Sequence, residues 1–150
     1  MGNPSNSIAP LLGRILISWI FLYSSVGQVT QLSLNVSHVA AQGMPFPLMA
    51  IVTSIIIQFF GGLALLLGFK GRITGWVLFI FLIPTTLMLH KFWGAAARPG
   101  QEIQFFKNMA IMGGLLFVAT FGAGAYSIDA LLVAKRSPII DSRVPSGSTT

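Results

Sequence analysis

The chain has 150 residues, of which 54% are hydrophobic and only 8% charged, and its formal net charge is +6. Soluble domains usually carry about a quarter charged residues, so the composition excludes a soluble globular protein and indicates an integral membrane protein. The cations lie in short segments between apolar runs, which argues against a nucleic-acid-binding face. Cysteine is absent, which excludes disulfides, thiolate metal sites and thiol redox chemistry.

The first predicted membrane span covers residues 9–29. Pro10 is compatible with its first turn, where the backbone needs no amide donor. Arg14 lies one turn inside the span, where its guanidinium can reach the headgroups. Gln28 lies near the far end. The polar loop that follows, residues 33–46, is long enough for a short interfacial helix.

The second and third predicted spans cover residues 47–68 and 73–92. Gln58 lies near the middle of the second span, and His90 lies in the last turn of the third. The turn that joins the two spans is short, so it predicts antiparallel neighbouring helices. It also carries two cations, as expected of a segment at the membrane surface.

The fourth predicted span covers residues 105–129, with Lys107 and Asn108 near its start and Asp129 at its end. The predicted fold class is therefore all-α, a membrane-embedded antiparallel four-helix bundle. The predicted organisation is an N-terminal segment over residues 1–8, one transmembrane domain over 9–133, and a disordered cytoplasmic tail over 134–150. We expect a multi-pass protein of the cell (inner) membrane.

The distribution of Lys and Arg predicts the orientation, because cytoplasmic segments carry an excess of cations. Six cations fall on the side of both termini and three on the other side, so both termini are predicted to be cytoplasmic. Three pairs of small residues four apart predict close helix packing in lipid: Gly71 and Gly75, Ala110 and Gly114, and Ala119 and Ala123.

The order of these features resembles the DoxX family of small four-helix membrane proteins. The resemblance covers about residues 10–130. Its motifs are Leu-Leu-Gly-Arg at 11–14, Gly-Met-Pro-Phe-Pro at 43–47, Phe-Gly-Gly-Leu-Ala-Leu-Leu-Leu-Gly at 60–68, Arg72, His-Lys-Phe-Trp at 90–93, the run that starts Phe-Phe-Lys-Asn at 105–116, and Gly-Ala-Gly-Ala-Tyr-Ser-Ile-Asp at 122–129.

The resemblance implies a membrane protein with a redox association, because the family takes its name from a subunit associated with a terminal quinol oxidase. It does not imply that the chain is itself an oxidase. Many members of the family carry Glu in the second span, before the paired glycines, where this chain has Gln58. Glutamine cannot take up or release a proton, so a proton relay through this position is not expected.

Two groups of polar residues are candidates for a role within the bundle. Arg14 and Asp129 are predicted at the same cytoplasmic depth, and we hypothesise an ion pair that joins the first and fourth spans. The alternative is that each reaches water independently. The second group is predicted near the outer ends of the helices, with one member deeper: Gln28, His90, Lys107, Asn108 and the deeper Gln58.

The second group could form a pocket for a quinone headgroup, whose carbonyls accept hydrogen bonds. Interfacial anchoring of these side chains is the alternative. A haem or metal site is not expected, because the chain has two histidines and no cysteine.

The functional prediction is an accessory subunit, without catalytic activity of its own, of a larger redox-linked membrane complex that handles quinol. The alternatives are a quinone-binding enzyme subunit and a small-solute carrier.

Overall fold

The computed structural model describes residues 8–89 and 100–136, and these residues form six helices and no strand. Four helices are long and apolar enough to cross a membrane: α1 (Ala9–Thr30), α3 (Pro47–Leu67), α4 (Gly71–Leu89) and α5 (Gln101–Phe121). Two are shorter: α2 (Leu32–Ala41) and α6 (Ile128–Arg136). The predicted all-α fold with four spans is confirmed, and α2 confirms the short helix predicted in the first loop.

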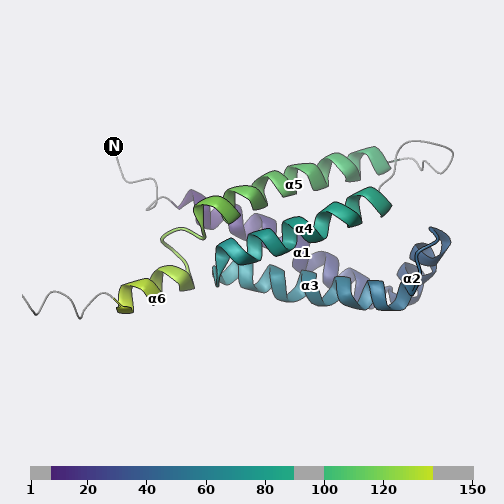
Figure 1. The fold of residues 1–150 in the computed structure, drawn as a ribbon, viewed down its shortest axis with the longest axis horizontal. Helices are drawn as coiled ribbons and strands as arrows, with labels where there is room; N and C mark the ends of the chain where they lie inside the picture. The colour runs from purple at the N-terminus through teal and green to yellow at the C-terminus, as the bar shows by residue number, and fades with distance from the viewer. Residues whose placement is uncertain (1–7, 90–99, 137–150) are drawn as a thin grey trace, which may run out of the picture.

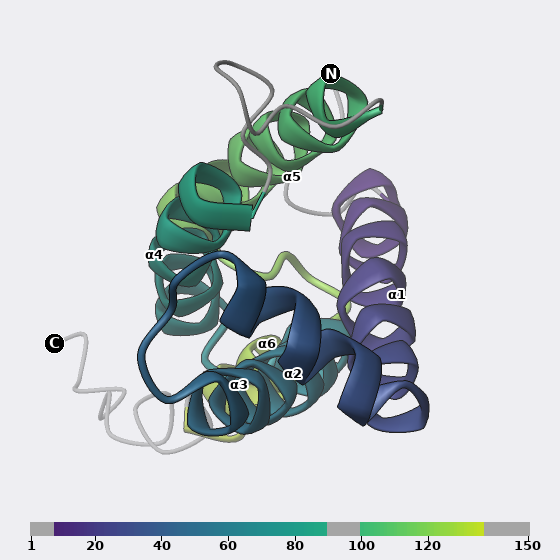
Figure 2. The same ribbon diagram turned by 90° about the vertical axis from the view of Figure 1, so that its right-hand side faces the viewer.

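The four long helices run antiparallel to their neighbours in sequence, so the bundle has two distinct ends (Figure 1). The α2 end holds the end of α1, the start of α3, the end of α4 and the start of α5. The α6 end holds their other ends. Helix α1 packs mainly against α3, and α4 packs mainly against α5, while direct packing between α1 and α5 is sparse. Figure 2 shows the bundle from the α2 end.

Local signals in the sequence set most helix boundaries. Prolines occupy the first turns of α1 and α3, where no amide donor is required. Helix α3 ends at Gly68, whose φ of 67° is the left-handed conformation that glycine adopts without a steric penalty. This turn places α4 antiparallel to α3, as predicted.

The core is a small cluster of apolar side chains in the middle of the bundle. Its buried members are Phe21, Leu65, Leu78, Leu82, Met112 and Leu115. The outer surface is also apolar: Leu16, Phe117 and Phe121 are each at least 70% exposed. A helix that is apolar on all sides matches a lipid environment, so the exposed residues need no aqueous solvation.

Small residues let α4 and α5 approach closely at the α6 end. A Cβ added to Gly75 would lie 2.9 Å from the backbone nitrogen of Ala119, and one added to Gly71 would lie 2.7 Å from Cβ of Ala123. Both contacts are closer than a real side chain tolerates. Two of the three predicted pairs of small residues therefore pack against each other, as helix association in lipid favours.

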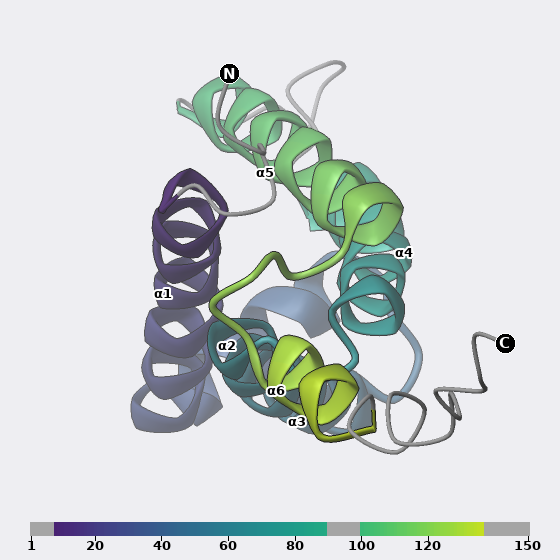
Figure 3. The same cartoon turned by 90° about the vertical axis from the view of Figure 1, so that its left-hand side faces the viewer.

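The fourth span differs from its prediction, which placed a single helix over residues 105–129. Helix α5 begins earlier, at Gln101, and ends at Phe121, because Gly122 and Gly124 have φ angles of 85° and 79°. Residues 122–127, here called the strap, then cross the α6 end of the bundle toward α1 and α3 (Figure 3).

Helix α6 follows the strap and runs to Arg136, past the predicted domain end at 133 and into the predicted disordered tail. The hydroxyl of Ser127 accepts a hydrogen bond from the backbone N–H of Ala130 at 3.2 Å, as an N-cap residue does. The rest of the predicted tail, residues 137–150, lies outside the described residues.

Candidate functional site

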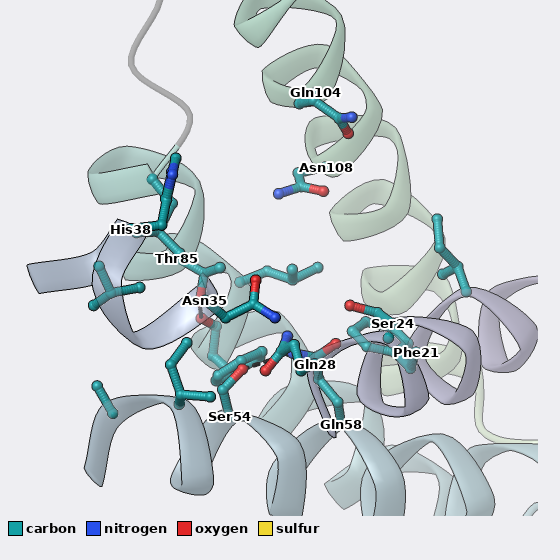
Figure 4. A pocket seen from close by; sticks show the side chains of 18 of the residues that line it. Phe21, Ser24, Gln28, Asn35, His38, Ser54, Gln58, Thr85, Gln104 and Asn108 are labelled. Carbon is teal, nitrogen blue, oxygen red and sulfur yellow. Dashed lines mark hydrogen bonds between the residues drawn. The ribbon is translucent and has the colours of Figure 1, made fainter. Parts of the chain in front are cut away.

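A cavity of about 980 Å³ lies at the α2 end of the described structure. Residues from α1 to α5 line it, and polar side chains from several helices converge on it (Figure 4). Four of the five residues predicted to form a quinone pocket are among its lining: Gln28, Gln58, Lys107 and Asn108. The fifth, His90, lies outside the described residues. The structure therefore brings four of the five predicted residues to one cavity, and whether they bind a quinone stays a prediction.

Among the predicted pocket residues, Gln58 lies farthest from the ends of its helix, near the middle of α3, and it is 5% exposed. Its amide nitrogen donates a hydrogen bond to the hydroxyl of Ser54, one turn earlier on the same helix, at 2.7 Å. An amide NH₂ group has two N–H donors, so this bond leaves a second N–H for a ligand. Figure 4 shows Gln58 beside Gln28 of α1.

Asn108 links α5 to α4. It is 6% exposed, and its amide nitrogen donates to the hydroxyl of Thr86 at 3.0 Å, a bond between two buried side chains. Thr86 is itself 1% exposed. A buried hydrogen bond in an apolar bundle fixes the rotamers of both partners, because leaving either group unpaired costs about 1–3 kcal/mol. Asn108 is thus held at the cavity wall.

Gln28 of α1 lines the cavity and carries a buried acceptor. Its carbonyl oxygen Oε1 is buried and has no hydrogen-bond partner among the described residues. Buried polar groups are nearly always hydrogen-bonded, so an unpaired oxygen at a cavity wall indicates a place where a donor from water or a ligand belongs. A quinone carbonyl cannot donate, whereas a hydroxyl can.

Sequence reasoning missed the contribution of α2 to the cavity. Asn35 and His38 line it, and His38 lies within hydrogen-bonding distance of the Gln42 side chain, at 3.2 Å. The sequence predicted a polar loop in this segment. A loop has no defined face, so Asn35 and His38 could not be assigned to the cavity. The signal that was available is their spacing, because residues three apart share one side of a helix.

Among the described residues, no group of three or more His, Cys, Asp or Glu side chains could hold a metal ion. The cavity lining combines apolar side chains with polar ones that are mostly amides and hydroxyls, and its ionisable side chains are Tyr23, His38 and Lys107. Lys107 is exposed. Such a lining recognises a neutral, hydrogen-bonding ligand in preference to an ion.

The second predicted pair, Arg14 and Asp129, lies at the opposite end of the bundle. Arg14 is 2% exposed, and its guanidinium donates from Nη2 to the backbone carbonyl of Tyr126 in the strap at 2.5 Å. Its Nε and Nη1 atoms have no hydrogen-bond partner among the described residues. The charge predicted to reach the headgroups is therefore buried beneath the strap.

Asp129 binds the start of α4. Its two carboxylate oxygens accept hydrogen bonds from the backbone N–H groups of Lys70 and Gly71 at 2.7 and 2.8 Å. These N–H groups have no partners within α4, so the carboxylate caps the helix from a distant segment of the chain. Arg14 and Asp129 thus both join the strap region to the bundle, each through backbone groups. A direct ion pair between them stays a prediction.

Comparison of the sequence with known proteins assigns the chain to a family. Residues 9–91, which include α1 to α4 and thus Arg14, Gln28 and Gln58, match the family model described as DoxX. The chain belongs to the DoxX family. As a DoxX protein with four helices long enough to span a bilayer, it is a multi-pass membrane protein.

Two relatives from Escherichia coli K12 resemble this DoxX chain over most of its length. The inner membrane protein YqjF is 34% identical over 85% of this chain and 95% of its own. The inner membrane protein YphA is 32% identical over 79% of this chain and 86% of its own. The ER-derived vesicles protein ERV29 of Saccharomyces cerevisiae is 27% identical over 51% of this chain and 25% of its own. No solved structure matches the chain.

Proposed function

We propose that this DoxX-family chain handles quinol in the membrane and holds the quinol ring in the cavity at the α2 end. The observation that carries the proposal is the buried Oε1 of Gln28, a residue of the cavity wall, which has no hydrogen-bond partner within residues 8–89 and 100–136. A quinol hydroxyl can donate a hydrogen bond to this oxygen. The second N–H of Gln58 and of Asn108 can donate to the oxygens of the ring. A quinol satisfies both kinds of group, since each hydroxyl donates and accepts.

The proposed role is that of an accessory subunit. Oxidation of a quinol releases two electrons and two protons, and the electrons need an acceptor. The chain has no cysteine and two histidines, so its own residues offer few ligands for a redox centre. In this proposal the electrons pass to a larger membrane complex that binds the chain, and the chain supplies the quinol site.

The proposed location is the inner membrane, by likeness to the two inner membrane proteins YqjF and YphA. The proposed orientation places the α6 end in the cytoplasm. From the order of the spans, the sequence assigns six cations to the side of the α6 end, Arg14, Lys70, Arg72, Lys135, Arg136 and Arg143, against three on the other side, Lys91, Arg98 and Lys107. This asymmetry follows the positive-inside rule and puts the cavity in the outer half of the bilayer.

The experiment is a fluorescence titration of a quinol analogue into the purified protein in nanodiscs. We expect saturable binding to the wild type and at least tenfold weaker binding to Gln28→Leu, because about 1.4 kcal/mol of binding energy corresponds to a factor of ten. Thr53→Val is the control, because Thr53 is exposed on α3 and does not line the cavity. It should bind as the wild type does.

Two outcomes would contradict the proposal. One is the absence of saturable binding by wild-type protein that is shown to be folded. The other is equal affinity for the wild type and Gln28→Leu. Uptake of a small polar solute into sealed vesicles, without quinol binding, would favour the carrier alternative instead.

A further inference from the structure

We infer that the cavity opens sideways into the lipid between α1 and α5, and that its ligand is a membrane-soluble amphiphile that enters through this opening. The ligand has a neutral hydrogen-bonding head and an apolar tail. The inference rests on the proposed function for the head of the ligand. It adds the route of entry and the need for a tail.

The first observation is how α1 and α5 meet. They touch at Gly114, where an added Cβ would lie 2.7 Å from Cδ1 of Ile17. Closer to the α6 end, Gly124 of the strap lies against Pro10, where an added Cβ would lie 3.0 Å from Cβ of Pro10. Toward the α2 end the two helices instead face each other across the cavity, and Figure 2 shows them well separated there.

The second observation is what lines this side of the cavity. Tyr23 and Ser24 of α1 and Lys107 and Ile111 of α5 all contribute to it. Tyr23 is 73% exposed and Lys107 is also exposed, so they stand at an opening and not at a closed wall. Helix α2 packs against α3 and α1, and no described helix lies between α1 and α5 on this side (Figure 2).

The third observation is the depth of the opening. Counted from the Ile17–Gly114 contact, Ser24 and Lys107 each lie seven residues nearer the α2 end, so in antiparallel helices they are at one level. That level is about 10 Å from the contact, at a rise of about 1.5 Å per residue. Ser24 is also six residues before the end of α1, so the opening falls within the hydrocarbon region.

These observations fix the class of ligand. A ligand that reaches the cavity at this depth comes from the acyl chains and must be soluble there. Its head meets amides inside the cavity, and its tail leaves past Tyr23 and Val26, which is 57% exposed. A polar solute without an apolar tail is poorly soluble among the acyl chains and would not enter by this route. A quinol with a long apolar chain matches both the amides of the cavity and the surrounding lipid.

The test seals the opening chemically. The chain has no cysteine, so Ser24→Cys with Lys107→Cys gives one unique thiol pair across the opening. The double variant in nanodiscs is treated with a bis-maleimide before or after a tailed quinol analogue is added, and binding and release are followed by stopped-flow fluorescence. We expect cross-linking to slow both association and dissociation at least tenfold, relative to the same protein left uncross-linked.

A matched pair controls for stiffening of the bundle. Ile17→Cys with Gly114→Cys cross-links the same two helices where they already touch, and it removes the Ile17 methyl group that the new Cβ would meet. This cross-link leaves the opening free, so association and dissociation should stay within about twofold of the uncross-linked rates. A slowing as large as in the first pair would overturn the sideways route.

The outcomes separate this inference from the proposed function. If the uncross-linked variants bind the analogue and sealing the opening changes neither rate, the ligand enters from the aqueous end and the inference fails while the quinol site stands. If the wild-type protein binds no analogue at all, the proposed quinol site itself is refuted. Faster binding of a tail-free analogue than of the tailed one to the uncross-linked protein would also contradict entry from the lipid.

Discussion

The two ends of this bundle use polar residues in different ways. At the α6 end, Arg14 and Asp129 bond to backbone groups of segments far away in the sequence, although Nε and Nη1 of Arg14 have no partner among the described residues. At the α2 end, Gln58 and Asn108 bond to single side-chain hydroxyls, and the buried Oε1 of Gln28 has no partner in the described part of the chain. The first end is closed by the strap, and the second surrounds a cavity of about 980 Å³.

This difference separates the residues that are expected to stabilise the fold from those that are expected to bind a ligand. Bonds to backbone groups fix the path of the chain, and glycines at the α6 end allow segments to approach within contact distance. Amides that face a cavity instead keep donors and acceptors available for a ligand. We therefore expect changes at the α6 end to reduce folding stability, and changes at the α2 end to reduce binding with little loss of stability.

The largest effect is expected for Gly68→Ala. Gly68 has a φ of 67°, and its added Cβ would fall on Nη1 of Arg14 and lie 2.5 Å from Cβ of Ser127. The backbone strain costs about 1–2 kcal/mol and overpacking about 1–3 kcal/mol more. We expect a loss of about 3 kcal/mol in the free energy of unfolding, measured by denaturant titration in mixed micelles.

Gly100→Ala is the control for this prediction. Gly100 has a similar φ of 81°, but an added Cβ would meet none of the described residues within 4 Å. It should therefore lose only the part due to backbone strain. Equal losses for the two variants would mean that contact with Arg14 and Ser127 does not contribute.

A smaller loss of stability is expected for Asp129→Ala. This change removes the acceptors for the N–H groups of Lys70 and Gly71 and leaves the start of α4 uncapped. Loss of a helix cap costs about 1–2 kcal/mol. Glu102→Ala is the control, because Glu102 lies in the first turn of α5 without capping it through a side-chain bond. Stability equal to that of the control would refute the capping role.

Gln58→Glu should make ligand binding depend on pH, while the protonated form keeps a stability close to that of the wild type. A protonated carboxyl group has the shape of the amide but one O–H donor in place of two N–H donors, so it donates to a ligand when the Ser54 hydroxyl turns to donate to its carbonyl oxygen. The charged form is costly at mid-membrane. Binding of the quinol analogue should therefore become pH-dependent, with near wild-type affinity at low pH and weaker binding as pH rises. An affinity that does not change with pH in the variant would argue that Gln58 does not contact the ligand.

The smallest effect is expected for Lys107→Gln. Lys107 lines the cavity but is exposed, and a flexible exposed side chain contributes little to a single contact. We expect less than a threefold change in affinity for the analogue in the same titration. A loss of tenfold or more would show that a charge, and not only the amides, takes part in binding.

The sequence was sufficient for the four spans and for much of the cavity. Apolar runs of membrane length and the short turn around Lys70 determined the antiparallel bundle. From that threading, Gln28, Gln58, Lys107 and Asn108 followed as one group, because antiparallel helices bring alternate ends together. The paired small residues predicted close helix packing in general, but not that α4 and α5 are the helices that approach.

The strap could not be predicted in the same way. Its glycines are also common within membrane helices, so Gly122 and Gly124 gave no clear sign that α5 ends there. The bond from Arg14 to the carbonyl of Tyr126 involves a backbone group, which no side-chain pattern reveals. The contribution of α2 to the cavity was missed for a similar reason, since a polar loop has no predicted face.

The most direct test of a ligand site at the α2 end is photolabelling with a quinol analogue that carries a reactive group on its ring, followed by peptide mapping. The account predicts labelling of cavity residues on α1, α3 and α5, including the neighbourhoods of Gln28, Gln58 and Asn108, that excess unlabelled quinol abolishes. Labelling that falls on lipid-facing residues such as Phe117 and Phe121, or that competitor does not reduce, would contradict it.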